Sequence, residues 1–368
     1  MAQKRYNLDS DGRIVNCSKK ADQPGDRPAE GEGAVTSTNQ KNQTTQASNT
    51  AESSTVKPPT DSGSASSSQL PPITGTDTPV PSNTNSTPET QQGTTVQPNT
   101  TSLAPSFTFS IGSWNTLYSN SAANIDAGTR YTAGKAVVIA YQEMRESASR
   151  RALRDALLCG SCQFQGEVGD YTTNGWTNVA LPVVWQKNSF QKISAGSVVA
   201  APSYITSNKY FTWVKLRHTA TQKEFYVVNV HPVAGAETAG KPSTDSTRVA
   251  TYKEYMNNLV ATLTSLKRSN IPIFVVGDYN VNYRYDSVVK NSMFPYYQLG
   301  QLGFRSNWDV LQLKSVLSTQ GTTKYSSTII DYIYFWQRSD VKANAEWISS
   351  YYYGSDHHLI TTNFTITQ

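Results

Sequence analysis

Aromatic residues are almost absent from the first 105 residues of this 368-residue chain, which contain Tyr6 but no Trp and no Phe. Ser, Thr, Asn, Gln and Pro dominate this segment, as in "TGTDTPVPSNTNSTPETQQGTTVQPNTT". Such a composition cannot bury enough apolar surface to offset the entropy lost on ordering. We therefore expect residues 1–105 to form a disordered tail or stalk. Residues 106–368, which hold all seven Trp and all eleven Phe, are expected to form one folded domain.

Cysteine is scarce as well, and only Cys17, Cys159 and Cys162 occur. A structural zinc site takes four ligands, and no second cysteine pair accompanies the C-x-x-C of Cys159 and Cys162. The surrounding sequence does not support a redox role. Two arrangements remain for this pair, namely a small local disulfide or two buried thiols.

Long apolar runs are missing too, and none reaches the 18 residues expected of a membrane-spanning helix. The N-terminal "MAQKRYNLDSDGRIVNC" lacks the apolar region of a signal peptide. A long tail rich in Ser, Thr, Pro and Asn is nevertheless typical of the stalk of an exported surface protein. The tail therefore favours a secreted or cell-surface location, while the N-terminus leaves a cytoplasmic one open.

Charge is divided unevenly between the two parts. The tail has eight Lys/Arg and ten Asp/Glu, a net charge of −2, whereas the domain has 24 Lys/Arg and 17 Asp/Glu, a net charge of +7. A basic domain is compatible with a phosphate-bearing polymer or an anionic membrane surface as its partner.

Apolar strands and amphipathic helices alternate along the domain, which predicts an α/β or α+β fold with a mixed sheet. Strands are predicted at 106–117, 136–140, 178–185, 209–218, 223–232, 271–277 and 327–336, with a last one after residue 357. Helices are predicted at 144–158 and 243–267, with shorter helical pieces near 286–302.

Polar residues end many of these strands, and this repeated feature carries the chemistry. They are Asn115, Glu143, His231, Asp278, Asn280, Asp356 and His357. Each alone is compatible with a turn or capping role. If the strand ends meet at one edge, however, they form an acidic cleft with imidazoles, because ligands bind beyond the carboxyl ends of strands in open α/β sheets.

The chemistry of these side chains favours metal-assisted hydrolysis of a phosphate ester. Glu143, Asp278 and Asp356 offer the hard oxygen ligands that suit Mg²⁺ or Mn²⁺. Histidine can transfer protons near neutral pH. Asp331 lies within an apolar strand, where a carboxylate is costly unless it is paired, and an imidazole is its natural partner.

The order of six short motifs resembles the endonuclease/exonuclease/phosphatase superfamily, with its deoxyribonuclease I-like fold. The motifs are W-N, Q-E, N-V-H-P, G-D-Y-N, I-D-Y and S-D-H-H, and the resemblance extends from about residue 107 to residue 366. It implies a four-layer α/β sandwich, in which helices flank two packed mixed β-sheets. It also implies a divalent-metal-dependent hydrolase of phosphoric esters, with Mg²⁺ or Mn²⁺ as cofactor.

The resemblance also assigns roles. Glu143 becomes the principal metal ligand with Asn115 beside it, and Asp356 lies near the metal. His231 contacts or protonates the phosphate, while Asp278 and Asn280 bind the attacking water and the phosphate. In the remaining two motifs, Asp331 orients His357, the catalytic imidazole. The role of general base stays shared between Asp278 and His357.

The substrate is less constrained, because the family includes nucleases, inositol-phosphate phosphatases and sphingomyelinases. The basic domain favours a nuclease acting as a phosphodiesterase on nucleic acid, with an inositol-phosphate or phospholipid phosphoesterase as the alternative. A noncatalytic, stalked surface-binding module is the third possibility. Arg130, Lys241 and Arg248 are candidate phosphate contacts, and Tyr353 could stack on a base or pack against a strand. A monomer is expected.

Overall fold

The computed structural model describes residues 7–8, 14–15, 106–144, 147–167, 180–202, 208–312, 321–324 and 327–367. In the N-terminal segment only β1 (Asn7–Leu8) and β2 (Ile14–Val15) are described, and they pair antiparallel. The predicted disorder of the tail otherwise lies outside the described residues, and the domain boundary at residue 105 stays a prediction.

The first of two six-stranded sheets has the strand order β15-β16-β3-β4-β6-β5. Its strands are β3 (Phe107–Asn115), β4 (Val138–Gln142), β5 (Phe164–Glu167), β6 (Val183–Gln186), β15 (Val341–Ile348) and β16 (Ile360–Ile366). β3 and β4 are parallel, and the other neighbours in this sheet are antiparallel.

The second sheet has the order β13-β14-β12-β9-β8-β7. Its strands are β7 (Phe190–Ala201), β8 (Lys209–His218), β9 (Glu224–Val230), β12 (Ile273–Asp278), β13 (Phe304–Ser306) and β14 (Asp331–Trp336). β9 and β12 are parallel, and the other neighbours are antiparallel. Each sheet therefore has one central parallel pair, whose two carboxyl ends lie at the same edge.

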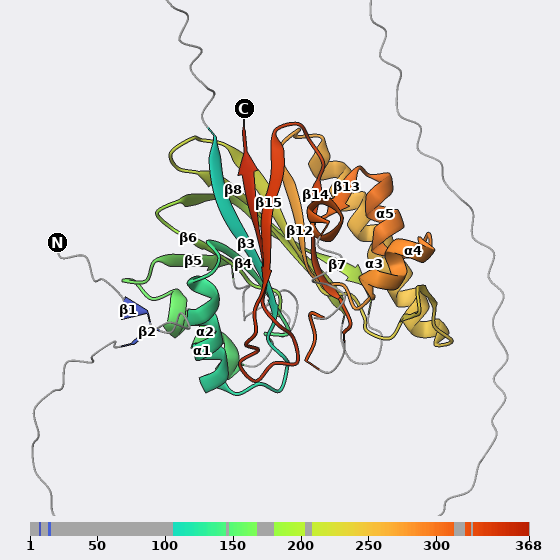
Figure 1. Cartoon of the computed structure of the whole chain (residues 1–368), viewed down its shortest axis with the longest axis horizontal. Coiled ribbons are helices and arrows are strands. Elements are labelled where there is room, and N and C mark those ends of the chain that lie inside the picture. The colour runs from blue at the N-terminus through green and yellow to red at the C-terminus, as the bar shows by residue number, and fades with distance from the viewer. Residues whose placement is uncertain are drawn as a thin grey trace, which may run out of the picture. The chain divides into compact units, whose positions relative to one another are not determined.

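Helices cover the outer face of each sheet (Figure 1), which completes the predicted four-layer α/β sandwich. On one side are α1 (Ala122–Ala133) and α2 (Ser147–Leu157); on the other are α3 (Ser246–Lys267), α4 (Tyr283–Val289) and α5 (Pro295–Gln301). The remaining elements are the short helix α6 (Asn307–Leu311) and the small pair β10 (Glu237–Thr238) and β11 (Lys241–Pro242). None of the described helices has both the length and the apolar character of a membrane span.

Phenylalanines fill the space between the sheets. The alternating Phe107, Phe109 and Ile111 of β3 are buried, as the period-two pattern predicts. The ring of Phe109 meets that of Phe274 from the second sheet edge to face, with centroids 5.6 Å apart. Phe274 also packs on Phe364 at 4.7 Å. These contacts between sheets fix the distance between the two parallel pairs.

The helix predicted at 243–267 is α3, and its buried side chains follow the predicted spacing. Tyr252, Met256, Leu259 and Leu263 are buried at steps of three and four residues. The N-cap is Asp245 rather than a serine or threonine, and its side chain accepts hydrogen bonds from two backbone N–H groups of the first turn. Aspartate is an equally good acceptor at this position.

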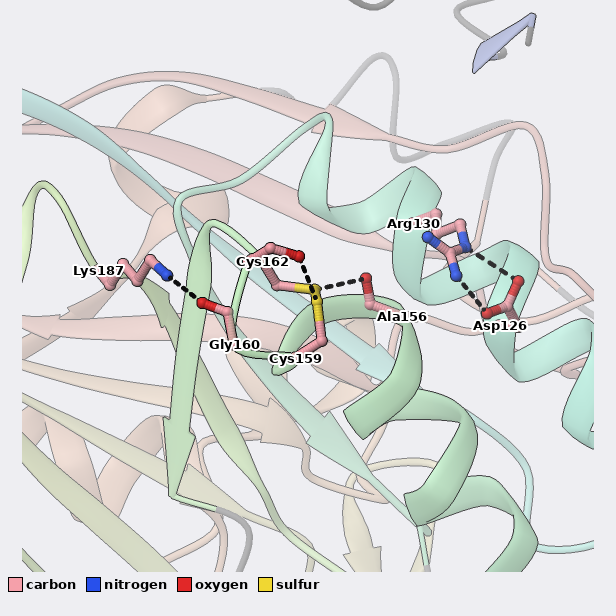
Figure 2. Close-up of a disulfide and its surroundings, with 8 residues drawn as sticks. Asp126, Arg130, Ala156, Cys159, Gly160, Cys162 and Lys187 are labelled. Carbon is pink, nitrogen blue, oxygen red and sulfur yellow. Dashed lines mark hydrogen bonds and ion pairs between the residues drawn. A yellow bond between two sulfur atoms is a disulfide. The ribbon is translucent and has the colours of Figure 1, made fainter. Parts of the chain in front are cut away.

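Cys159 and Cys162 form a disulfide just after α2 (Figure 2), which is one of the two arrangements expected. The Cα atoms are 4.9 Å apart, and the Sγ of Cys162 also contacts the carbonyl of Ala156 in the last turn of α2. Lys187 Nζ donates to the carbonyl of Gly160 inside the short loop, at 3.2 Å. The disulfide thus closes the turn between α2 and β5.

We expect Asp286→Asn to stabilise the protein at pH 8 but not at pH 4. Asp286 Oδ2 accepts from Tyr296 N at 2.9 Å, and Oδ1 has no partner among the described residues. Burial raises the pKa of Asp286 to about 7. Because the folded state holds this proton more tightly than the unfolded chain, stability falls as pH rises from about 4 to about 7, by up to about 4 kcal/mol.

Urea unfolding at both pH values measures this difference. The asparagine introduced by Asp286→Asn cannot ionise, so the variant keeps the stability that the wild type loses on the alkaline side. The control is Val288→Ala, at an exposed position of the same helix α4, and its effect should be equal at the two pH values because no ionisable group changes. A constant difference between Asp286→Asn and the wild type would contradict the prediction.

Candidate active site

Two strands of the first sheet end in polar side chains at one edge of the sandwich. Asn115 is the last residue of β3, and Glu143 follows the last residue of β4. Asn115 Nδ2 donates to Glu143 Oε1 at 3.2 Å and, across the gap between the sheets, to Asp278 Oδ2 at 3.0 Å. Asn115 Oδ1 accepts from Leu117 N at 3.0 Å. This buried amide joins carboxylates from both sheets.

Glu143 has an unusual backbone conformation, with φ of 59° in the left-handed region. For a residue with a Cβ this conformation costs about 1–2 kcal/mol, and such strain is often found at functional sites. Glu143 Oε2 accepts from Tyr118 N at 2.8 Å. Burial by itself raises the pKa of Glu143, but His231, the Asn115 amide and this N–H together hold it below its usual value. The carboxylate is therefore ionised at neutral pH.

His231 follows β9 in the second sheet and faces the carboxylates of both sheets. Its Nε2 lies 3.6 Å from Glu143 Oε1 and 3.5 Å from Asp278 Oδ2. Its backbone N–H donates to the hydroxyl of Tyr255, a buried residue of α3, at 3.0 Å. The long helix therefore anchors the segment that presents this imidazole.

Asp278, the last residue of β12, is the centre of the site. It is 1% exposed, and besides Asn115 and His231 its Oδ2 faces His357 Nε2 at 3.7 Å. Its Oδ1 accepts from Asn280 N at 2.8 Å. Burial raises the pKa of Asp278, but His357 and then His231 lower it to about 2. The central carboxylate thus stays ionised.

The backbone around Asp278 is built for close approach to β9. A Cβ at Gly277 would lie 2.1 Å from the carbonyl oxygen of Val230, so only glycine fits where the parallel strands meet. Asn280 has φ of 52° and donates from Nδ2 to the carbonyl of Pro232 at 3.2 Å. The loops after β9 and β12 are thereby held together.

Asp331 and His357 form a buried pair, Asp331 at the start of β14 and His357 in the turn before β16. Asp331 is the first residue of β14 and is paired in register with Asp278 of β12. Its Oδ2 lies 2.8 Å from His357 Nδ1. Burial by itself lowers the pKa of His357, but the carboxylates of Asp331 and Asp278 raise it above its usual range. His357 therefore favours the imidazolium form, with Nε2 directed at Asp278.

The turn before β16 is fastened to the end of β3. Ser355 Oγ donates to the carbonyl of Asn115 at 2.6 Å and accepts from His357 N at 3.0 Å. Asn120 Nδ2 donates to the carbonyl of Tyr353 at 2.9 Å. Gly354 has φ of 75°, and a Cβ there would lie 2.2 Å from Asn124 Nδ2. The turn thereby places His357 against Asp331 with little freedom.

The donor groups fit a hard divalent cation. Carboxylates outnumber imidazoles at this edge of the sandwich: Glu143, Asp278, Asp331 and Asp356 face His231 and His357. Donor atoms of Asp278, Asp331 and His357 lie within 4.8 Å of one another. Asp331 Oδ1 is buried without a partner among the described residues. Excess negative charge on oxygen donors suits Mg²⁺ or Mn²⁺ better than a softer metal.

The structure brings the predicted strand-end residues together, and the predicted phosphate contacts lie on the elements around them. Arg130 lies on α1 and is paired with Asp126 of the same helix (Figure 2). Arg248 donates to the carbonyl of Ala234 at 2.8 Å and supports the loop after His231. Lys241 belongs to the small strand β11 of that loop.

Tyr353, the candidate for base stacking, is partly buried and packs against other tyrosines. Its ring centroid is 5.0 Å from that of Tyr131 on α1 and 6.0 Å from that of Tyr351. Asp356, by contrast, lies at the site, with Oδ1 3.9 Å from His357 Nε2, and it is partly exposed. Asp356 thus lies beside the other strand-end residues, as predicted.

Sequence reasoning missed the residues that support the site. Gln142 and Asn229 make a hydrogen bond between the two sheets, and Ser355 and Asn120 hold the turn before His357. Gln142 and Asn229 stand in the Q-E and N-V-H-P motifs, so their positions beside predicted site residues were an available signal. No such signal marks Asn120.

Solved structures resemble this fold. An endonuclease/exonuclease/phosphatase family protein from Bacteroides thetaiotaomicron aligns with a TM-score of 0.50 and 13% identity, covering 72% of this chain and 96% of that one. A second such protein, from Bacteroides vulgatus, aligns with a TM-score of 0.51 and 14% identity over 71% and 99%. A functionally unknown conserved protein from Enterococcus faecalis gives 0.50 and 16% over 70% and 100%.

No protein-family model matches the sequence, and no curated protein matches it significantly. The structural likenesses, together with the two six-stranded sheets, show that the chain has the deoxyribonuclease I-like fold of endonuclease/exonuclease/phosphatase proteins. The fold expected from the motif order is thereby confirmed. At these identities the likeness concerns architecture, so the activity must be argued from the site.

Proposed function

We propose that this protein is a divalent-metal-dependent hydrolase of phosphoric esters, acting as a phosphodiesterase on nucleic acid. The observation that supports this most is the convergence of an oriented imidazole pair and several carboxylates around Asp278. Residues 106–368 are the proposed catalytic domain, and we expect it to act as a monomer.

The residues of the chain divide into two groups in this proposal. Glu143 holds the Mg²⁺ or Mn²⁺ ion, with Asp356 nearby and Asn115 orienting the carboxylates. When bound, the ion supplies positive charge that stabilises the negative charge on the phosphoryl oxygens. The assignment is supported by the ionised Glu143 side chain and by its strained backbone, with the carboxylate lying beside His231.

The second group acts on the water and the phosphate. Asp278 and Asn280 bind and orient the attacking water, while His231 and His357 donate hydrogen bonds to the phosphate. Asp331 holds Nδ1 of His357, which fixes the direction of Nε2. Water adds its oxygen to phosphorus and gives a proton to the general base, a role that Asp278 and His357 share. The ester P–O bond breaks, and the leaving oxygen gains a proton from His231. Preorganised donors of this kind stabilise the charge that develops in the transition state.

Charge supports nucleic acid as the substrate class. The domain carries a net charge of +7, which favours a polyanion over a neutral or zwitterionic ester. Lys241 lies in the segment that follows His231, and Arg248, in the first turn of α3, donates to the carbonyl of Ala234 in that segment. Both are candidate contacts to phosphates beside the cleaved bond. A sphingomyelin headgroup has no net charge and would gain nothing from this field.

One assay panel tests the proposal. The full chain is incubated with Mg²⁺ or Mn²⁺ and plasmid DNA, RNA, an inositol polyphosphate or sphingomyelin. We expect cleavage of nucleic acid that EDTA abolishes and that Glu143→Ala and His357→Ala each lower strongly. Cleavage that survives both substitutions would overturn the site assignment. Turnover of only the inositol phosphate or sphingomyelin would overturn the substrate, and no turnover at all would favour a noncatalytic module.

A further inference from the structure

Two buried amides link the sheets directly beneath the site. Gln142 is the last residue of β4 in the first sheet, and Asn229 is the penultimate residue of β9 in the second. Gln142 Nε2 donates to Asn229 Oδ1 at 2.9 Å, and both residues are 0% exposed. The surrounding interface is mostly apolar, so this polar contact is an exception that calls for an explanation.

The bonds of Asn229 extend this contact into the backbone. Asn229 Nδ2 donates to the carbonyl oxygens of Tyr141 at 2.8 Å and Pro182 at 3.1 Å. Gln142 Oε1 accepts from Ser113 Oγ of β3, at 3.4 Å. Each polar atom of both amides is thus used, which defines one relative position for the strands.

The two residues stand next to groups of the proposed site. Asn229 and His231 are two positions apart, so their side chains project to the same face, between the sheets. Gln142 immediately precedes Glu143, and neighbours in a regular strand would point to opposite faces. Because Glu143 has a left-handed φ, it departs from this strand alternation, and its carboxylate lies 3.6 Å from His231 Nε2.

We propose that Gln142 and Asn229 are positioning residues, which set the position of Glu143 relative to the second sheet and thereby the affinity for the ion. The distance from Glu143 to His231 reports this position. This inference rests on the proposed function where it concerns the metal. A buried polar pair can often be replaced by apolar side chains with little loss of stability, so stabilisation alone does not account for it. Residues that orient metal ligands typically change metal affinity about 10–100-fold when replaced.

The test compares Gln142→Leu, Asn229→Leu and the double variant in the full chain. Direct Mn²⁺ titration, followed by the electron paramagnetic resonance of the free ion, gives the dissociation constant without catalysis. Each single variant is expected to bind Mn²⁺ about 10-fold more weakly or worse. The double variant should be no worse than the weaker single one, because both act through one contact.

Asn307→Leu is the matched control. Asn307 is also a 0% exposed amide that connects the sheets, donating to Thr362 Oγ1 of β16 at 3.0 Å and accepting from Ile333 N of β14 at 3.1 Å. It has no contact with Glu143 or His231. We expect Asn307→Leu to lose stability while its Mn²⁺ affinity stays at the wild-type value.

Crystal structures of the metal-free variants provide the second readout. In the Gln142 and Asn229 variants the distance from Glu143 Oε1 to His231 Nε2 should increase by about 1 Å, enough to cost about 100-fold in rate. Unchanged distances and Mn²⁺ affinities, or equal shifts in Asn307→Leu, would overturn the positioning role. If the wild type binds no Mn²⁺, the metal dependence of the proposed function is refuted. The distance between Glu143 and His231 in the variants would still test the positioning role of Gln142 and Asn229.

Discussion

Glu143→Ala is expected to lower kcat/KM for phosphodiester hydrolysis by about 1,000-fold, since a metal contributes several kcal/mol and each 1.4 kcal/mol is tenfold. Glu143 directly follows β4 at this edge, and its Oε1 lies 3.6 Å from His231 Nε2. Steady-state kinetics across a Mg²⁺ series measures the effect, and excess Mg²⁺ should recover part of the lost rate.

A control separates this loss from general damage. Glu224, at the start of β9, also accepts from two basic partners, Lys215 and Arg217, but it lies at the opposite end of its strand from His231. Glu224→Ala should keep the wild-type kcat/KM. If the two glutamate variants lost activity equally, the assignment of Glu143 to the metal would be wrong.

The backbone conformation of Glu143 leads to a separate prediction about the stability of variants at this position. At φ of 59°, an alanine carries the left-handed penalty and a glycine does not. Glu143→Gly should therefore be more stable than Glu143→Ala by about 1 kcal/mol, although both lack the carboxylate and its bonds. Urea unfolding in EDTA measures the difference. Equal stabilities would show that the strain is not present in solution.

The architecture could be predicted where side-chain periodicity is strong. Strand 209–218 is found within the same bounds as β8, and the long helix α3 keeps its predicted C-terminal end. The sequence "AANIDAGTRYTA" of α1 was missed, because its small and polar residues show no clear apolar stripe. That helix begins at the Ser121 N-cap and owes its place to buried Ile125 and Tyr131.

The strand β7 was missed for a related reason. Its sequence contains Ala, Gly and Ser, which favour no strand by themselves. Pairing with β8 imposes the conformation, and Gly196 leaves room for the ring of Trp213, which a Cβ would approach to 2.8 Å. The strand conformation of β7 thus depends on its pairing with β8 and cannot be predicted from the sequence of β7 alone.

The site, too, has residues that the sequence could indicate and residues that it could not. Strand-end position alone indicated Asn115, Glu143, His231 and Asp278, because the carboxyl ends of the two parallel pairs meet at one edge. The tie between Asn120 and the carbonyl of Tyr353 joins residues 233 positions apart. No sequence pattern connects such distant segments, so the residues that hold the turn before His357 can be identified only in the folded structure.

The pair of Asp331 and His357 gives the second large prediction. Asp331→Asn keeps the size of the side chain and an oxygen that can face Nδ1, but it removes the negative charge 2.8 Å away. General acid–base groups contribute about 100- to 10,000-fold, so we expect a loss of at least about 100-fold in kcat, and a larger one for His357→Ala. Trp308→Phe is the control. It removes the indole N–H that donates to the backbone carbonyl of Asp331 at 3.3 Å and leaves the carboxylate intact.

The pH dependence then shows how His357 works. The carboxylate of Asp331 raises the pKa of His357, so Asp331→Asn must lower that pKa, and the imidazolium loses its proton at a lower pH. Because the raised pKa keeps His357 protonated near neutral pH, we expect the alkaline limb of the pH–kcat profile to move to lower pH. Movement of the acidic limb instead would identify His357 as the general base. A profile with both limbs unmoved would mean that Asp331 does not act through His357. The buried Asp331 carboxylate would then have to act through its other oxygen, Oδ1, which has no hydrogen-bond partner among the described residues.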